Sequence, residues 1–167
     1  PGPSKGPIIQ IPNGDLLMPM NGGLTGDDNS VDRSYLLHSK DHGKNWLYYS
    51  SIHYATEDPN PELPGRWAGS CEPSVALLPN GQMLAMLRTQ GTQYLGAYKP
   101  MYVCWSNDLG RTWTKPTPTN PHLMCISPTL QVLDNGLVAC LYGRPGCYVV
   151  FSLDNGQTWQ DRVGFSD

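Results

Sequence analysis

The sequence predicts an all-β protein built from propeller blades, and three observations lead to this prediction. An octapeptide with the frame SxDxGxxW occurs three times, at residues 39–46, 106–113 and 152–159. An Asn-Gly pair flanked by apolar residues precedes each octapeptide, which is a strong signal for a β-hairpin. The chain holds 18 Gly and 16 Pro, and no stretch of helical period is long enough for a helix. Repeats of this kind, each with four short strands, are typical of propeller blades.

Each repeat predicts four antiparallel strands in the order A, Asn-Gly turn, B, loop, C, octapeptide and D. In the first blade, residues 5–52, we expect strands at 8–11, 16–20, 34–38 and 46–50. In the second blade, residues 71–116, we expect them at 74–78, 83–89, 101–105 and 113–115. In the third blade, residues 125–162, we expect them at 128–133, 137–143, 147–151 and 159–161. The Asn-Gly turns are expected to be of type I′, and residues 1–167 form a single partial propeller.

The octapeptide is interpreted as a structural box that closes the turn between strands C and D. Its Ser and Asp can accept backbone N–H groups that the turn leaves unpaired, its Gly supplies a positive φ, and its Trp begins strand D. The twelve positions are Ser39, Asp41, Gly43, Trp46, Ser106, Asp108, Gly110, Trp113, Ser152, Asp154, Gly156 and Trp159. One carboxylate per turn is too few oxygens for Ca²⁺, so we expect no metal site.

Composition narrows the classes of partner. The net charge is -3 and Lys and Arg form no cluster, which argues against nucleic acid or an anionic membrane. No apolar run reaches the ~20 residues of a membrane helix, and neither the N-terminus nor any other segment indicates a compartment. Five cysteines without a CxxC pair support neither zinc nor a full set of disulfides, so most are expected to be buried thiols. A small soluble ligand and no cofactor are expected.

Antiparallel alternation predicts which residues meet at the rim opposite the boxes. The start of strand A, the end of strand B, the B–C loop and the D–A link must all lie there. Counted from the turn glycines, the starts of strand A are Lys5, Glu72 and Ser127, and the ends of strand B are Asn21, Arg88 and Arg144. Glu72, Arg88 and Arg144 are therefore expected to face one opening.

Two guanidinium groups near each other favour a planar anion such as a carboxylate as their ligand. The alternative is that these residues are solvated charges, or that Glu72 pairs with Arg88 inside its own blade, which is often worth less than ~1 kcal/mol when exposed. Asp27, Asp28 and Asp32 fall in a B–C loop on the same rim and are interpreted as a solvated loop. Trp67, in the Pro-rich link between the first two blades, could line the opening or pack beneath it.

The three segments resemble the sialidase (neuraminidase) superfamily, whose propellers carry such Asp boxes or BNR repeats. GPIIQIPNGDLLMPM is similar to the family's blade with a glycine-rich first strand and an LxxP strand. CEPSVALLPNGQMLAMLRT resembles the segment in which a glutamate begins one strand and an arginine ends the next, here Glu72 and Arg88. GRPGCYVVFSLDNGQTW resembles the segment with an arginine eight residues before a box serine, here Arg144 and Ser152.

The resemblance implies a six-bladed fold and an exo-acting, retaining glycoside hydrolase that removes sialic acid or a related acidic sugar from glycoconjugates. It also implies that Arg88 and Arg144 bind the sugar carboxylate and that Glu72 is the base partner of a nucleophilic tyrosine. The family's first arginine, its acid aspartate and its tyrosine have no counterpart here, so the segment alone is expected to be inactive. Members of the family are often secreted or periplasmic.

Two questions stay open from the sequence. Three blades leave the faces of the first and last blade uncovered, so either the rest of a longer chain or a second copy in a homodimer is expected to close the ring. The function is either that of the hydrolase or that of a non-catalytic Asp-box propeller that binds a carbohydrate or a protein. In either case, replacing Arg88 or Arg144 by alanine is expected to weaken binding of an acidic sugar with little loss of thermal stability.

Overall fold

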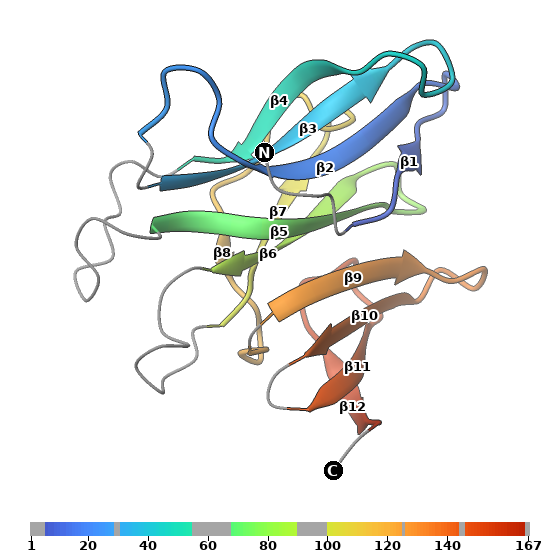
Figure 1. Cartoon of the computed structure of the whole chain (residues 1–167). Helices are drawn as coiled ribbons and strands as arrows, with labels where there is room; N and C mark the ends of the chain where they lie inside the picture. Colours follow the sequence, from blue (N-terminus) through green and yellow to red (C-terminus); the bar gives the residue numbers. More distant parts are fainter. Residues whose placement is uncertain are drawn as a thin grey trace.

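The computed structural model describes residues 6–28, 31–54, 68–89, 100–124, 126–143 and 146–165. Within these residues the fold contains strands and no helix, which confirms the all-β prediction. None of the described segments forms a helix with the length and apolar character needed to span a bilayer. Figure 1 shows three twisted antiparallel sheets beside one another.

The first sheet contains four strands, β1 (Ile9–Gln10), β2 (Leu16–Gly22), β3 (Val31–Ser39) and β4 (Leu47–His53). The second contains β5 (Ala68–Leu77), β6 (Met83–Thr89), β7 (Tyr102–Ser106) and β8 (Thr117–Pro118). The third contains β9 (Ile126–Val132), β10 (Val138–Gly143), β11 (Cys147–Ser152) and β12 (Gln160–Gly164). In each sheet, strands that follow one another in the chain pair antiparallel.

The first two sheets also join directly through a short parallel ladder in which Val31 pairs with Ala68 and Asp32 with Gly69. This ladder was not predicted, because strand β3 was expected to begin only at residue 34. The last strand of the second sheet also differs from the prediction. Residues 113–115 do not form a strand, and β8 comprises only Thr117–Pro118. Three nearby prolines, Pro116, Pro118 and Pro121, have no backbone N–H to donate, so few hydrogen bonds to a neighbouring strand can form here.

The Asn-Gly turns are not of type I′. In the first of them the N–H of Gly14 donates to the carbonyl of Ile11 at 2.9 Å, and positive φ occurs at Gly14 (89°) but not at Asn13. This pattern is typical of a three-residue loop, in which a type I turn is followed by one left-handed residue. Pro12 favours it because proline fixes φ near −65° at the second position of the turn. The turns at Gly81 and Gly136 have the same hydrogen bond and the same positive φ.

The boxes close their turns with a repeated set of hydrogen bonds. In the first box the Ser39 hydroxyl accepts from the N–H of Gly43 at 2.9 Å and donates to Asp41 at 2.8 Å. The Asp41 carboxylate accepts from the N–H of Asn45 at 2.9 Å, and the indole of Trp46 donates to the carbonyl of Gly43 at 3.0 Å. The same serine and aspartate bonds recur in the other two boxes. The residue before each glycine, His42, Leu109 or Asn155, also has a positive φ, which the sequence did not indicate.

Strand β6 is buried on both faces and joins two hydrophobic clusters. Met83, Ala85 and Leu87 pack toward the first blade, and Leu84 and Met86 toward the third. The cysteines Cys71, Cys104 and Cys140 are buried and free, as expected for small apolar side chains. Burial raises the pKa of the Cys104 and Cys140 thiols to about 12, so neither is a reactive thiolate.

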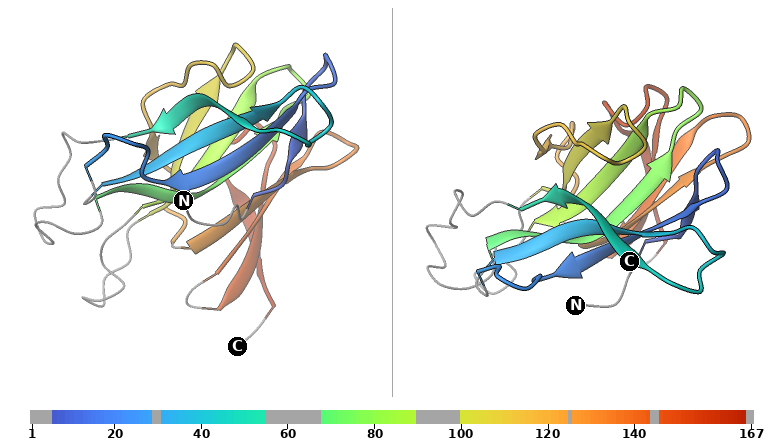
Figure 2. Two further views of the ribbon diagram at one scale, coloured as in Figure 1. Left: turned by 45° about the horizontal axis from the view of Figure 1, so that its top comes forward. Right: turned by 90° about the horizontal axis from the view of Figure 1, so that it is seen from above.

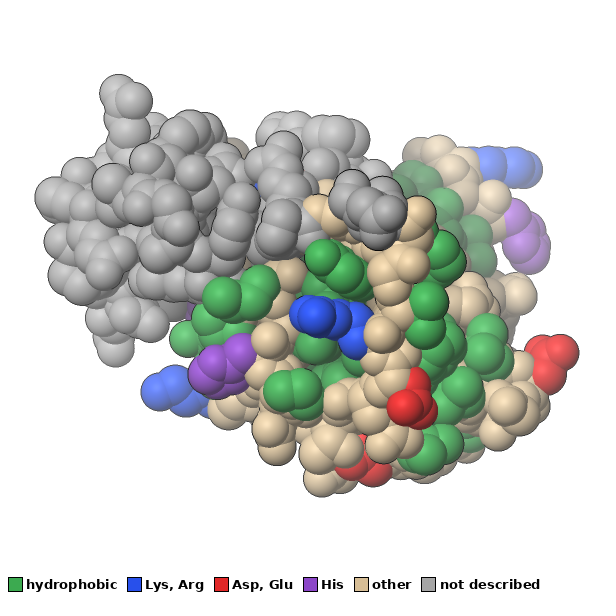
Figure 3. All heavy atoms as spheres, turned by 90° about the horizontal axis from the view of Figure 1, so that it is seen from below, with side chains coloured by type: hydrophobic (Ala, Val, Ile, Leu, Met, Phe, Trp, Pro, Cys, Tyr) green, Lys and Arg blue, Asp and Glu red, His purple; other side chains and the backbone are tan. Residues whose placement is uncertain are grey.

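Each later box packs against the blade before it. A Cβ at Gly110 would lie 2.7 Å from Leu36, and a Cβ at Gly156 would lie 2.5 Å from Leu84. In the two views of Figure 2 the sheets are rotated relative to one another, and the Asn-Gly hairpins of the three blades lie toward one end of the molecule. On the third sheet, Leu141 and Val163 share a cross-strand row with Val149 and are 43% and 49% exposed. Figure 3 shows hydrophobic side chains scattered among polar ones on the side of the molecule where this sheet lies.

Candidate functional site

Glu72 and Arg88 form an ion pair on the rim opposite the boxes. Arg88 lies near the end of β6 and pairs in register with Cys71 of β5, the residue before Glu72. The Nη1 atom of Arg88 donates to Oε1 of Glu72 at 3.1 Å, and the two side chains are only 13% and 10% exposed. The structure therefore brings together two of the three site residues that the sequence predicted.

The second carboxylate oxygen of Glu72 reaches into the neighbouring blade. Oε2 accepts from the backbone N–H of Ser127 at 2.9 Å and from its hydroxyl at 3.0 Å. Ser127 is the residue that occupies the Glu72 position in the third blade when both are counted from their turn glycines. The sequence placed it in the same frame but did not indicate a role. Glu72 thus ties β5 and β6 to β9.

A local distortion of the backbone directs these side chains. Glu72 has φ of 46° and Ser127 has φ of 52°, and both lie where the ladder to the next strand shifts register. A left-handed conformation costs a non-glycine residue about 1–2 kcal/mol. Strain of this type is kept where the surrounding structure holds it, and it is concentrated at functional sites. Simple alternation of side chains along a strand could not predict it.

Several residues that the sequence analysis placed on this rim lie outside the described part of the chain. They include Arg144, the second predicted carboxylate ligand, together with Lys5 and Trp67. The role of Arg144 stays a prediction.

The loop with Asp27 differs from the predicted solvated loop. The Nε atom of Arg33 donates to Asp27 Oδ2 at 2.8 Å, and Nη2 of Arg33 donates to the other carboxylate oxygen. The Asp27 side chain is only 8% exposed, and the Arg33 guanidinium lies 3.7 Å from the centroid of the Tyr54 ring. The sequence held one signal for this ion pair, namely an aspartate and an arginine at the two ends of one short loop.

The ion pair decides what Asp27 can do chemically. Hydrogen bonds from Arg33, and after them the backbone N–H of Leu24, lower the pKa of Asp27 from 3.8 to about 2. A general acid needs a pKa near the working pH, so Asp27 does not suit the role of a proton donor in neutral solution. Its contacts instead fix the loop on the rim.

We predict that the stabilising effect of Asp27 depends on pH. Its pKa is lower in the folded chain than in the unfolded one, so the stabilisation is complete above about pH 4 and is lost as the pH falls toward 2. The melting temperature of Asp27→Asn should therefore lie below that of the wild type at pH 7, and the gap should narrow toward pH 3. Thermal unfolding followed by circular dichroism at several pH values measures this. A gap that is constant with pH, or equal to that of the exposed control Asp134→Asn, would contradict it.

A third polar cluster joins the first two blades beneath the rim. The Ser34 hydroxyl donates to the carbonyl of Ser70 at 2.9 Å, and Nδ1 of His53 lies 3.0 Å from the Ser70 hydroxyl. Ser70 is 1% exposed, so its hydroxyl is buried away from any substrate on the surface. This Ser–His contact is a packing contact between blades. In the described residues no group of three or more His, Cys, Asp or Glu side chains could hold a metal ion.

Comparisons with known proteins agree with this fold. A model of the BNR repeat-like domain family matches residues 1–167. No curated protein sequence matches the chain. The solved structures that resemble it include a protein of unknown function from Dyadobacter fermentans DSM 18053, with a TM-score of 0.73 and 20% identity over 97% of this chain and 41% of that one.

Two structurally similar proteins are enzymes that act on sugars. The Hadza microbial sialidase Hz136 has a TM-score of 0.63 and 22% identity over 94% of this chain and 29% of its own. An α-L-arabinanase from Penicillium chrysogenum has the same TM-score and identity over 94% of this chain and 47% of its own. The chain thus spans less than half the length of these three proteins, and its fold is that of glycoside hydrolases. Because the family model covers every residue, the chain belongs to the family of BNR repeat-like domains, which confirms its resemblance to the Asp-box propellers of the sialidase superfamily.

Proposed function

We propose that the chain carries part of the substrate site of an exo-acting, sialidase-type glycoside hydrolase that removes a terminal acidic sugar from glycoconjugates. The observation that carries this proposal is the Glu72–Arg88 ion pair, held at 3.1 Å on the rim opposite the boxes. Its two residues come from the strand start and the strand end that the family resemblance selects. The similarity to a sialidase, at 22% identity, supports the fold on which this proposal is built.

In this proposal Arg88, together with Arg144, binds the carboxylate of the sugar. A guanidinium group has five N–H donors in a planar fork, so it can serve Glu72 and a ligand carboxylate together. Glu72 acts as the base partner of a tyrosine nucleophile. A phenol oxygen suits this reaction because an anionic Asp or Glu would be repelled by the carboxylate at the anomeric centre.

A non-catalytic binding module is the second candidate function. One observation favours it: both carboxylate oxygens of Glu72 already accept hydrogen bonds, one from Arg88 and the other from Ser127. A carboxylate whose two oxygens both accept hydrogen bonds can fix the positions of the strands around a binding surface. The same rim would then bind an acidic sugar without cleaving it.

Binding of N-acetylneuraminic acid, measured by calorimetry, tests the proposed ligand class. Arg88→Lys keeps a positive charge beside Glu72 but removes the bidentate fork, so we expect it to weaken binding by about tenfold. Arg111→Lys, at an exposed arginine of the second box, is the matched control and should bind like the wild type. Equal affinity in the wild type and in Arg88→Lys would overturn the role of Arg88.

Hydrolysis of a fluorogenic sialoside by the full-length protein then separates the enzyme from the binding module. We expect release of the fluorophore by the wild type and a loss of at least about a hundredfold in Glu72→Gln. Binding without release in the wild-type protein would support the module and reject the hydrolase.

A further inference from the structure

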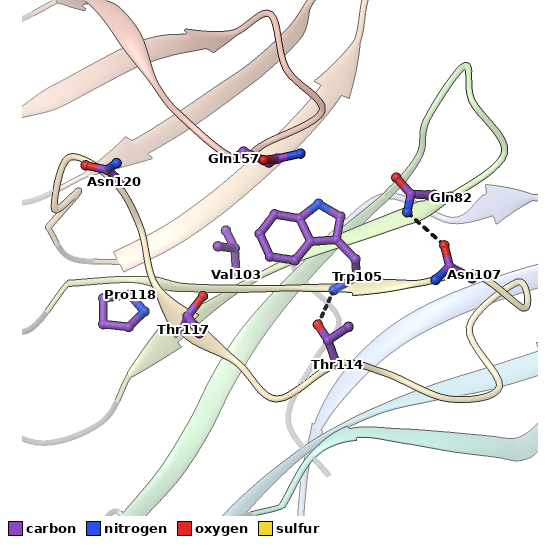
Figure 4. A pocket seen from close by; sticks show the side chains of 9 residues that line it. All are labelled: Gln82, Val103, Trp105, Asn107, Thr114, Thr117, Pro118, Asn120 and Gln157. Carbon is purple, nitrogen blue, oxygen red and sulfur yellow. Dashed lines mark hydrogen bonds between the residues drawn. The ribbon is translucent and has the colours of Figure 1, made fainter.

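A cavity of about 460 Å³ lies at the other end of the second blade, where the box of the third blade packs against it. Its walls come from β7, from the second box, from the segment around β8 and from Gln82 and Gln157 in two neighbouring turns. Figure 4 shows the Trp105 ring in the middle of these side chains, with Gln157 on one side of it and Thr114 on the other. Pockets of 300–1,000 Å³ are the usual size for small-molecule sites.

The lining residues that the structure describes combine an apolar surface with amides and hydroxyls, and none of them carries a charge. Trp105, Val103 and Pro118 supply the apolar part. The polar part consists of amides, such as Asn107 and Gln157, and of threonine hydroxyls. A neutral sugar ring has the matching chemistry, because its C–H groups form an apolar face and its hydroxyl groups both donate and accept hydrogen bonds. The carboxylate of an acidic sugar would have no Lys, Arg or His side chain to pair with among these described lining residues.

Several of these groups are fixed before any ligand binds. The indole Nε1 of Trp105 donates to the carbonyl of Asn155 at 2.9 Å, and its backbone N–H donates to the Thr114 hydroxyl at 3.0 Å. Gln82 donates to the side-chain carbonyl of Asn107 at 2.7 Å, so the amide nitrogen of Asn107 is left as a donor. A site that is ordered in advance loses less entropy when a ligand binds.

Other polar groups around the ring are open to solvent. Within the described part of the chain, the side-chain amides of Asn120 and Gln157 and the hydroxyl of Thr117 make no hydrogen bond to another residue. All three residues are exposed. Their water molecules can be replaced by sugar hydroxyls, which form equivalent hydrogen bonds.

We propose that this cavity is a second carbohydrate site, which binds a neutral sugar ring against Trp105 with hydrogen bonds from Asn107, Asn120, Gln157 and Thr117. It is separate from the Glu72–Arg88 rim, because Gln82 and Arg88 stand at the two ends of β6, about 20 Å apart at 3.3 Å per residue. It can therefore hold a second sugar unit or a branch of a glycan, whichever function the rim has.

Titration of the ¹⁵N-labelled chain with methyl β-D-galactopyranoside and methyl β-D-glucopyranoside tests the proposal. We expect the indole N–H signal of Trp105, assigned with Trp105→Phe, to shift with a dissociation constant of about 1–10 mM for at least one of them. Gln157→Ala and Asn107→Ala should each weaken binding about threefold to tenfold. Gln160→Ala, which changes an exposed glutamine outside the cavity, should bind like the wild type.

Three results would overturn the proposal. The first is that the Trp105 signal does not shift with either glycoside. The second is that Gln157→Ala and Asn107→Ala bind the glycoside as tightly as the wild type does. The third is that the signal shifts only with N-acetylneuraminic acid or with a proline-rich peptide. The stability of the variants is checked by thermal unfolding, and Gln157 and Asn107 are exposed, so their truncation is expected to leave the fold intact. Because Arg88→Lys lies at the opposite rim, it should not affect this titration, which keeps the two proposals apart.

Discussion

Replacing Gly69 by alanine should lower the melting temperature of the chain by about 5–15 °C. Gly69 has φ of 89°, and a Cβ there would lie 2.2 Å from the carbonyl oxygen of Asp32. That oxygen belongs to the backbone of the ladder between β3 and β5, so it cannot move aside as a flexible side chain would. The left-handed backbone costs about 1–2 kcal/mol and the overpacking about 1–3 kcal/mol more.

The matched control is Gly81→Ala. Gly81 has nearly the same φ, 85°, but no atom lies within 4 Å of a Cβ at this position. Only the conformational cost remains, so we expect a loss of about 1–2 kcal/mol. Thermal and urea unfolding of the two variants measure the difference. If both lost the same stability, the close contact between the two blades at Gly69 would be refuted.

Replacing Glu72 by alanine should destabilise the fold by about 3 kcal/mol, because it leaves a largely buried guanidinium without its ion-pair partner. It also removes the acceptor for the N–H and hydroxyl of Ser127, so the contact between the second and third blades is lost as well. For a chain of 167 residues this corresponds to a melting temperature lower by about 6–12 °C.

A double-mutant cycle with Arg88→Ala isolates the ion pair. We expect a coupling free energy of about 1–3 kcal/mol between the two positions, whereas the exposed control Asp134→Ala should show none with Arg88→Ala. This revises the expectation drawn from the sequence, in which removal of Arg88 left thermal stability nearly intact. Wild-type stability in both single variants would restore that expectation and would make the ion pair a contact of little energy.

The fold was largely predictable because its signals are local. The boxes, the Asn-Gly turns and the alternating apolar strands repeat three times, and each feature depends on a few neighbouring residues. The prediction of type I′ turns was wrong because it weighed Asn-Gly alone, although Pro12 and Pro79 stand where a type I turn places proline. The strand expected at 113–115 was wrong because the prediction did not weigh Pro116 and Pro118, which have no N–H group to donate to β7.

For the candidate site, the sequence predicted which residues lie on the same rim but not their backbone conformation or their contacts. Counting from the turn glycines brought Glu72 and Arg88 to one rim, and it also placed Ser127 in the same frame. It could not predict that Glu72 and Ser127 adopt a left-handed backbone, because the hydrogen bonds between blades that hold this conformation join residues 55 positions apart. The Asp27–Arg33 ion pair joins residues only six positions apart and had a local signal, but its burial under Tyr54, which follows another strand, did not.

The packing of Gly110 on Leu36 and of Gly156 on Leu84 gives the array a polarity along the chain. In both cases a later unit presents a bare patch of backbone, and the earlier unit fills it with a leucine. The earlier unit therefore provides the side chain on which the turn of the following unit packs. The two leucines do not occupy equivalent positions of the repeat, because Leu36 lies in β3 and Leu84 lies in β6, so each contact between neighbouring units is packed in its own way.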